Sequence, residues 1–407
     1  MTAHATLSHD SDAALARLIR FLSVPGITGE ELIGRDVAKA LTEAGVPAKG
    51  INFDDAHTRI PLPTQTGNLI VHLPGRGALC NAEPLLFMTH LDTVPLCAGA
   101  KPKVKGKKII NEANTALGGD NRCSCAVLVT LAAELMKSKV DHAPMVLVFC
   151  VREESGLWGA RHINPKYIGS VSMGFNFDGR APSDVVVGAV GGDKWSVEIH
   201  GRASHAGVAP ERGISATMIL ALALAQVRKG GWFGKVVKGK RVGTSNVGPV
   251  SGGPIIGGMS RPAGDATNVV TDYVYVEGES RSQDLAFIKE ITAAHKGAFT
   301  EAAKTVTNSD GKAGKVKFTS ALGYYPFEMK KNEAVVQRAI HAVKEIGLTP
   351  DVRLASGGLD ANWLVRHGVP TVTFGSGQND VHTVDEWIDI PRFQDACRLA
   401  LQLATGR

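Results

Sequence analysis

The chain has 407 residues, of which 44% are hydrophobic and 21% charged, and its formal net charge at pH 7 is +6. This length and composition are ordinary for a soluble globular protein of two domains with a substantial core. No apolar run reaches the roughly 18 to 20 residues of a membrane span, and residues 1–18 contain no apolar signal core, so we predict a cytoplasmic protein without a membrane partner.

In chain order, the two ends of the sequence alternate apolar strands with helices. The expected strands are 67–75, 84–92, 143–154, 172–179 and 369–377, and the expected helices include 123–138 and 332–347. This alternation is typical of an α/β domain in which helices cover both faces of a mixed, mostly parallel sheet.

Between about Gly191 and Tyr324 the order changes to strand, helix, strand, strand, helix, strand. The strands are expected at 194–201, 244–250, 267–279 and 315–325, and the helices at 214–229 and 282–304. This βαββαβ order is that of a ferredoxin-like sandwich. We predict that residues 191–324 form a small domain inserted into a larger one made of residues 1–190 and 325–407.

Lysine and arginine gather in two runs, 101–108 and 228–241. We interpret both as solvated loops, because no aromatic stacking motif accompanies them, and we expect no nucleic-acid partner. The six cysteines are few, and several lie inside apolar runs where a reduced thiol behaves as a small hydrophobic group. They indicate no disulfide framework.

Polar side chains appear where the apolar strands of the larger domain end. They are His90, Asp92, Glu153, Glu154, Asp178 and His382, joined by Asp120 from the loop before a helix. In open α/β sheets, ligands bind beyond the carboxyl ends of the strands. We therefore expect these side chains to meet at one rim of the sheet.

Each of these residues also has an ordinary interpretation. A single histidine after a strand is more often a hydrogen-bonded loop residue, and Asp120 alone is more often a helix N-cap. Several unpaired carboxylates would however repel one another, and a pair of divalent cations would remove that cost. Imidazole nitrogen and carboxylate oxygen suit Zn²⁺, with Co²⁺ or Mn²⁺ as substitutes.

Short motifs along nearly the whole chain resemble those of metallopeptidase family M20. They are HLDTVP (90–95), LGGDN (117–121), REESG (152–156), FDG (177–179), ASHAG (203–207), SGGLDAN (356–362) and VHTVDE (381–386). The last two look most like the peptidase T branch of aminopeptidases. The resemblance implies a zinc-peptidase-like catalytic domain, with the inserted domain serving as a lid and as the contact of a homodimer.

The resemblance also implies a cofactor of two divalent metal ions bridged by Asp120. His90 and Asp178 would complete the site of one ion, and Glu154 and His382 the site of the other. Asp92 would accept the second ring N–H of His90 and fix its tautomer. 

The general base implied by the family is Glu153. It would take the proton of a water shared by the two ions, and the resulting hydroxide would attack the scissile carbonyl. Glu153 would then protonate the departing amine.

Further site residues come from the inserted domain and from a glycine pair. His205 would polarise the substrate carbonyl, often from the partner subunit, although it could instead cap the following helix. Asn268 and Arg281 would hold the substrate backbone or carboxylate, the alternative for Arg281 being a surface strand residue. Gly357 and Gly358 would let a substrate approach the backbone, or form an ordinary turn.

The sequence departs from the family pattern after the bridging aspartate. Relatives usually read Asp-Asp-Lys-Ala-Gly there, whereas this chain reads DNRCSCA. The resemblance predicts a cis peptide bond between Asp120 and Asn121. Cys123 and Cys125 are expected to pack within the helix, because no nearby base activates them.

These residues favour an aminopeptidase with two zinc ions acting on di- and tripeptides. A second hypothesis keeps the metal chemistry but removes an acyl group or a C-terminal residue, as an amidohydrolase, deacylase or carboxypeptidase would. A third is a non-catalytic binding homologue, which should lack a ligand or the base. None of these residues is missing from the chain.

Overall fold

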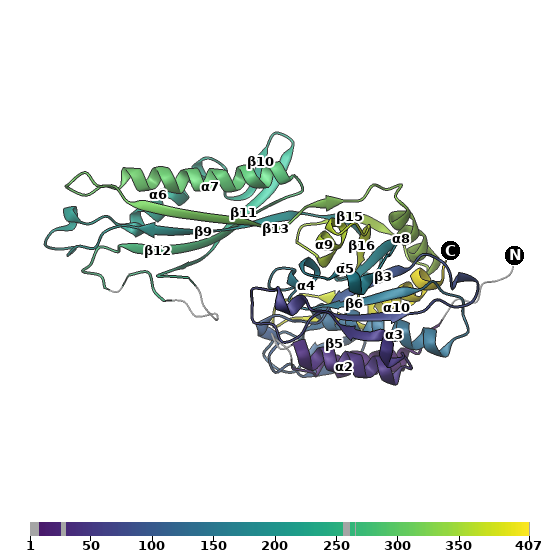
Figure 1. Cartoon of the computed structure of the whole chain (residues 1–407). Helices are drawn as coiled ribbons and strands as arrows, with labels where there is room; N and C mark the ends of the chain where they lie inside the picture. Colours follow the sequence, from purple (N-terminus) through teal and green to yellow (C-terminus); the bar gives the residue numbers. More distant parts are fainter. Residues whose placement is uncertain (1–7, 26–29, 255–260, 265, 407) are drawn as a thin grey trace. The chain divides into compact units, whose positions relative to one another are not determined.

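The structure is a computed structural model that describes residues 8–25, 30–254, 261–264 and 266–406. The chain divides into two compact units, one formed by Met1–Ala189 with Glu328–Arg407 and the other by Val190–Phe327 (Figure 1). Within the described residues, no helix combines the length and apolar character that a membrane span requires.

The first unit is built on a mixed sheet with the strand order β1-β2-β6-β3-β7-β16-β8-β14, in which β15 also pairs with β8. The strands are β1 (Ile51–Phe53), β2 (Leu69–Leu73), β3 (Leu85–His90), β6 (Met145–Cys150), β7 (Met173–Phe177), β8 (Asp184–Ala189), β14 (Phe327–Glu328), β15 (Asp351–Ala355) and β16 (Thr371–Phe374). The central strands β6, β3, β7 and β16 are mutually parallel. The predicted mixed α/β fold is confirmed.

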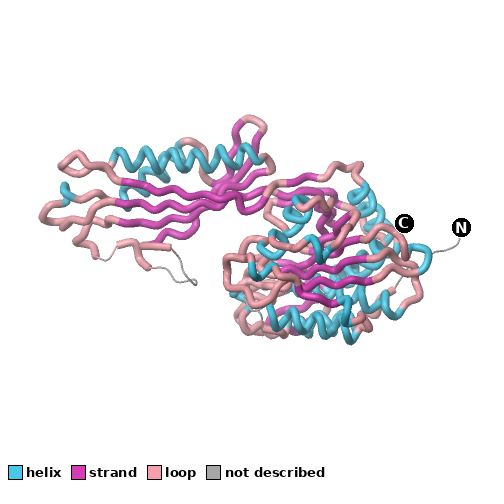
Figure 2. Tube along the Cα trace, in the orientation of Figure 1, coloured by secondary structure: helices cyan, strands magenta, loops and turns pink. Residues whose placement is uncertain are grey.

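Helices lie on both sides of this sheet (Figure 2). They are α1 (Ser11–Leu22), α2 (Glu30–Glu43), α3 (Gly119–Lys137), α4 (Trp158–Arg161), α5 (Pro165–Ile168), α8 (Ala334–Glu345), α9 (Asp360–Arg366) and α10 (Ile390–Thr405). Helix α3 packs against β3, whereas α9 packs against β7 and β16. Every residue of β3 and β6 is buried, as expected for central strands covered on both faces.

A small second sheet of the first unit corrects one prediction. Strands β4 (Pro102–Lys105) and β5 (Lys108–Asn111) form a hairpin at residues 101–108, where the sequence had indicated a loop. The hairpin continues to β18 (Trp387–Asp389) and β17 (Gln378–Asn379). Gly106 supplies the positive φ of the turn, and the buried Ile109 anchors β5, so two uncharged residues decided the structure of a lysine-rich segment.

The second unit contains an antiparallel sheet with the order β10-β11-β12-β9-β13. Its elements are β9 (Gly191–His200), α6 (Ala216–Lys229), β10 (Gly234–Lys238), β11 (Arg241–Ser251), β12 (Tyr273–Ser282), α7 (Leu285–Thr305) and β13 (Lys315–Tyr324). Without β10 this is the predicted βαββαβ order. The additional strand lies in the second basic run, where a loop had been predicted, because Gly239 makes the turn and Val236 is fully buried.

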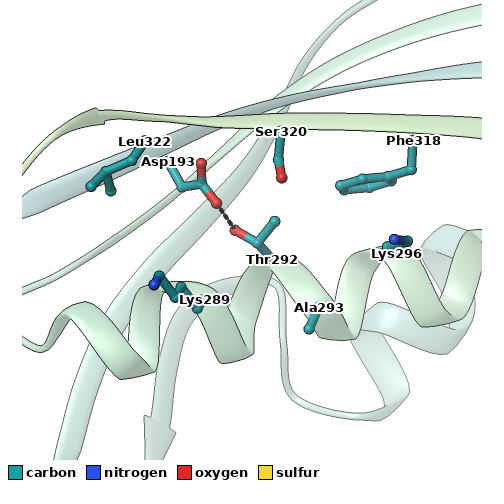
Figure 3. Close-up of a pocket in the computed structure, with 8 residues that line it drawn as sticks. All are labelled: Asp193, Lys289, Thr292, Ala293, Lys296, Phe318, Ser320 and Leu322. Carbon is teal, nitrogen blue, oxygen red and sulfur yellow. Dashed lines mark hydrogen bonds between the residues drawn. The ribbon is translucent and has the colours of Figure 1, made fainter.

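Helix α7 and strands β9 and β13 border a cavity of about 330 Å³ in the second unit (Figure 3). There the Thr292 hydroxyl donates a hydrogen bond of 2.8 Å to the carboxylate of Asp193. Burial raises the pKa of Asp193. None of the residues predicted for the active site lines this cavity.

Candidate metal centre

Three neighbouring strands of the first unit deliver polar side chains to one rim of the sheet. His90 is the last residue of β3 and is 1% exposed. Glu153 and Glu154 follow β6 in a turn, and Asp178 directly follows β7. Because these strands are parallel and adjacent, their carboxyl ends lie together, as the sequence predicted.

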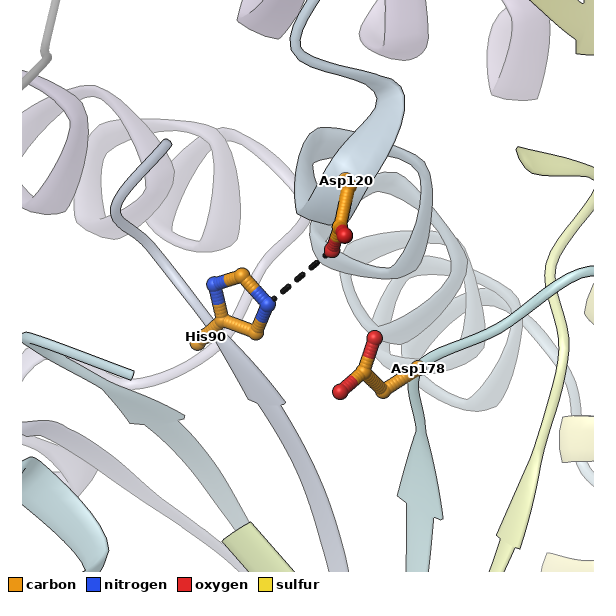
Figure 4. Close-up of side chains that lie close together, drawn as sticks. All are labelled: His90, Asp120 and Asp178. Atoms are coloured by element: carbon orange, nitrogen blue, oxygen red, sulfur yellow. Dashed lines mark hydrogen bonds and ion pairs between the residues drawn. The ribbon is translucent and has the colours of Figure 1, made fainter. Parts of the chain in front are cut away.

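A first group of potential ligand atoms comes from His90, Asp120 and Asp178. One ligand atom of each lies within 4.8 Å of the others. The ring nitrogen Nε2 of His90 is 3.2 Å from Oδ1 of Asp120, and the side chains of all three residues point into one space (Figure 4). One imidazole and two carboxylates are a suitable donor set for a zinc ion.

A second group consists of Asp120, Glu154 and His382, again with ligand atoms within 4.8 Å of one another. Nε2 of His382 is 2.8 Å from Oε1 of Glu154 and 3.3 Å from Oδ2 of Asp120. Asp120 thus belongs to both groups and turns a different carboxylate oxygen toward each histidine. This is the arrangement required of a carboxylate shared by two ions.

A third group of ligand atoms within 4.8 Å of one another comes from His90, Glu153 and Glu154. Glu153 is 9% exposed and lies directly beside the first two groups. A carboxylate at this position, belonging to neither of the other groups, is available to exchange protons.

The electrostatics of the site favour added positive charge. Burial raises the pKa of Glu153, Glu154 and Asp178, and repulsion from neighbouring carboxylates raises these values further. Burial acts in the same direction on Asp120, but hydrogen bonds with His382 and His90 hold the pKa of Asp120 well below its usual value. Divalent cations would offset this repulsion, so the residues present fit a metal centre.

The neighbouring carboxylates also raise the pKa values of the two histidines, against the effect of burial. Burial acts to lower the pKa of His90, yet hydrogen bonds to Asp120 and Asp92 raise it well above the usual value. Hydrogen bonds to Asp120 and Glu154 raise the pKa of His382 to about 10. Both imidazoles therefore face a strongly anionic environment, as metal-binding histidines of such a centre should.

Asp92 makes contacts that its sequence motif did not predict. Nδ1 of His90 is 3.1 Å from the backbone carbonyl oxygen of Asp92 and 3.5 Å from its Oδ1. The carboxylate instead accepts shorter hydrogen bonds from the backbone N–H groups of Glu153, at 2.9 Å, and Glu154, at 3.1 Å. The carbonyl is thus the closer partner of the ring, and the carboxylate holds the turn that carries the two glutamates.

Glu386 is a second residue whose contacts were not predicted, although it ends the motif VHTVDE. Its buried carboxylate accepts the backbone N–H groups of Leu117, Gly118 and Asp120 at 2.7, 2.8 and 3.1 Å. Gly118 has a φ of 81°, in the left-handed region that favours glycine. Glu386 therefore holds the turn that presents Asp120.

The start of α3 contains the predicted cis peptide bond between Asp120 and Asn121, which is confirmed. The side chain of Asn121 donates to the Phe177 carbonyl at 2.8 Å, next to Asp178. Cys123 and Cys125 are buried in the helix, as expected, and the Cys125 thiol donates to the His90 carbonyl at 3.2 Å. All six cysteines are free thiols.

His205, Asn268 and Arg281 belong to the second unit. The backbone carbonyl of Asn268 accepts the N–H of Ala206 at 2.8 Å, so the loops of His205 and Asn268 are joined. The N-cap of α6 is Ser215, so capping of this helix is not the role of His205. Arg281 lies on β12 and pairs with Glu279 at 2.8 Å.

The motif SGGLDAN leads into α9. A Cβ added to Gly357 would meet no atom within 4 Å, so close packing does not require glycine there. Gly358, the next residue, is half-buried. Asp360, a residue of this motif without a predicted role, is 1% exposed, and burial raises its pKa to about 7.

Residues 86–406 match the model of Peptidase family M20/M25/M40. The uncharacterised protein YqjE of Bacillus subtilis is 29% identical over 325 residues, which cover 80% of each chain. The crystal structure of aminopeptidase PepT from Bacillus cereus is 28% identical, with a TM-score of 0.80 and 98% of each chain covered. A tripeptidase from Staphylococcus aureus is 25% identical, with a TM-score of 0.84 over 98% of this chain and 99% of that one.

Proposed function

Because this chain belongs to Peptidase family M20/M25/M40 and is a metallopeptidase resembling the peptidase T branch, we propose that it removes the N-terminal residue from di- and tripeptides. The observation that carries the proposal is the position of Asp120 between two histidine-containing groups, with Glu153 beside them. The similarity to an aminopeptidase and a tripeptidase along almost the entire chain supports this substrate class.

The proposed cofactor is a pair of divalent ions, Zn²⁺ in first place and Co²⁺ or Mn²⁺ as substitutes. His90, Asp120 and Asp178 would hold one ion, and Asp120, Glu154 and His382 the other. When bound, such ions acidify a water molecule and polarise the scissile carbonyl. The mixed nitrogen and oxygen donors suit these metals.

Glu153 is the proposed general base. Burial raises the pKa of its carboxylate, so Glu153 binds a proton more readily than an exposed glutamate does. Asp92 holds the backbone N–H of Glu153 and thereby orients the turn. In the reaction, Glu153 takes a proton from the attacking water and returns it to the departing amine.

The second unit would contribute contacts to the substrate. We propose that His205 donates a hydrogen bond to the carbonyl oxygen of the scissile bond, either within one chain or from the partner in a homodimer. Asn268 and Arg281 would bind the peptide backbone or its carboxylate, and Gly357 and Gly358 would leave room beside it. The joined loops of His205 and Asn268 support a shared role for these two residues.

The test is hydrolysis of a tripeptide panel by the metal-reconstituted protein. We expect release of the first residue from peptides with a free amino group, and no cleavage of the same peptides after N-acetylation. Release of acyl groups or of C-terminal residues instead would favour the amidohydrolase, deacylase or carboxypeptidase alternative.

A matched pair of variants tests the mechanism. Glu153→Ala should keep its metal content and lose roughly 10²- to 10⁴-fold in kcat, the usual contribution of a general base. Glu301→Ala, which removes an exposed carboxylate of α7, should leave both unchanged. Full activity of Glu153→Ala would remove Glu153 from the mechanism.

A further inference from the structure

A small cavity beside Asp178 contains a cationic side chain that the proposed reaction does not use. We propose that Arg180 binds a carboxylate group of the peptide substrate, from an acidic side chain or from the C-terminus, and so gives the enzyme a preference for peptides that carry this group. This inference rests on the proposed peptidase function, which it extends to a substrate class.

The cavity has a volume of about 240 Å³ and lies entirely within the first unit. Its walls include Asp178 and Arg180 from the loop after β7, Asp184 from β8, Arg353 from β15 and Phe374 from the end of β16. It therefore adjoins a residue of the candidate metal centre. Its volume is below that of most sites for whole ligands, so it suits a single side chain or terminal group.

The backbone of Arg180 is tightly fixed. Its carbonyl accepts the N–H of Gly377 at 3.0 Å, and the N–H of Gly375 donates to the Ala181 carbonyl at 2.9 Å. A Cβ on Gly375 would lie 2.1 Å from the Ala181 nitrogen, so glycine is needed for this close approach. These contacts fix the backbone of Arg180 two residues after Asp178.

The charges of the cavity leave one cation without a counter-charge. Arg353 forms an ion pair with Asp184 and lies 3.6 Å from the carboxylate of Asp351. Asp178 belongs to the first group of the metal centre. Arg180 is exposed, and its guanidinium forms no ion pair or hydrogen bond with any residue that the structure describes.

An unpaired guanidinium beside a peptidase centre is suited to a carboxylate, which it can bind through two parallel hydrogen bonds. A peptide offers this group from two sources, the side chain of Asp or Glu and the C-terminal carboxylate. Both present the same chemistry, so the assay must separate them.

The experiment measures kcat/KM for matched peptides with the metal-loaded enzyme. One arm compares tripeptides that carry Glu with peptides that carry Gln at the second or third position. The other arm compares trialanine with its C-terminal amide. We expect the acidic member of one arm to be preferred by roughly 10- to 100-fold, the range of a hydrogen-bonded charge pair.

In Arg180→Gln this preference ratio should fall to about one, because the amide carries no charge. In Arg35→Gln, which changes an exposed arginine of α2, the ratio should stay at the wild-type value. Equal midpoint temperatures of thermal unfolding in the wild type and the two variants show that both variants are folded. The inference is overturned if the wild type shows no acidic preference in either arm, or if Arg180→Gln lowers the preference in neither arm.

Failure of the peptidase proposal has a different signature, namely that metal-loaded wild type cleaves none of these peptides. Calorimetric titration then still decides the inference, since wild type should bind the acidic member of one of the two peptide pairs more tightly than its neutral counterpart, and Arg180→Gln should not. Equal affinities of the wild type within both pairs would overturn it.

Discussion

The carboxylate of Glu386 accepts the backbone N–H of Asp120 at 3.1 Å, across a sequence separation of 266 residues. Two further N–H groups, of Leu117 and Gly118, bind the same carboxylate. A Cβ at Gly119 would lie 3.1 Å from it, so the turn is closely fitted around this side chain. Residues that orient a ligand in this way commonly affect metal affinity as much as activity.

We predict that Glu386→Gln weakens metal binding by roughly 10- to 100-fold, because an amide nitrogen cannot accept the N–H groups that the second carboxylate oxygen accepts. Calorimetric titration of the metal-free protein with Zn²⁺ measures the change. The neighbouring Asp385 is exposed, and Asp385→Asn serves as the control. Unchanged affinity in Glu386→Gln would show that the turn holds its form without this residue.

Replacing Asp120 and replacing Asp178 should change the number of bound metal ions by different amounts. Because Asp120 belongs to both groups of ligand atoms, we expect Asp120→Ala to lose both ions. Asp178 belongs to one group, so Asp178→Ala should retain about one ion per chain. Elemental analysis after dialysis measures the ratio of metal to protein. Two ions retained by Asp120→Ala would contradict a shared ligand.

We expect Asp92→Asn to disturb the orientation of the base Glu153 while the metal ligands stay in place. The amide keeps one oxygen acceptor for two N–H groups that now bind two oxygens, so the turn of Glu153 and Glu154 loses a hydrogen bond. We expect a fall in kcat of roughly 10- to 100-fold, with KM changed less. Steady-state kinetics at saturating Zn²⁺ are the measurement, with the exposed Asp12→Asn as control. If Asp92→Asn has the wild-type kcat, the Asp92 carboxylate does not orient the base.

His295 should make the second unit sensitive to acid. It is fully buried, its Nε2 lies 3.2 Å from the Trp232 carbonyl and 3.1 Å from the Ser245 hydroxyl, and burial lowers its pKa to about 4. The unfolded chain protonates this histidine more readily than the folded chain does. The contribution of neutral His295 to the free energy of unfolding is therefore fully present above about pH 6.5 and is lost as the pH falls toward 4. The loss at pH 5 relative to pH 8 is on the order of 2 kcal/mol.

Replacing this histidine tests its contribution. His295→Gln should be less stable than wild type at pH 8, but its free energy of unfolding should change less between pH 8 and pH 5. Urea unfolding followed by tryptophan fluorescence measures both, since the rings of Trp195 and His295 are 4.7 Å apart. Equal pH dependence in the two proteins would show that His295 does not carry the effect.

Several features followed directly from local sequence patterns. The apolar runs that become β3 and β6 predicted central strands, and the order of elements predicted the mixed α/β fold. The polar residues that end these strands were likewise visible, because a parallel sheet places the ends of neighbouring strands together. Their ligand atoms indeed meet within 4.8 Å.

Charge counts were a poorer guide to local structure. Both basic runs were expected to be loops, and both form hairpins. In each, a glycine at positive φ makes the turn and a buried Val or Ile holds a strand, while the lysines remain on the surface. The conformation of each hairpin thus depends on its few buried and turn-forming residues, not on its lysines.

The sequence by itself determined which residues could bind metal and which strands would carry them, because periodicity and residue chemistry depend on neighbours along the chain. Only the tertiary structure decided which groups hold them in place. The carboxylates of Asp92 and Glu386 bind backbone N–H groups that lie 61 and 266 residues away, respectively. Such pairings depend on how β3, β6, α3 and β18 pack against one another, and no local pattern encodes that packing.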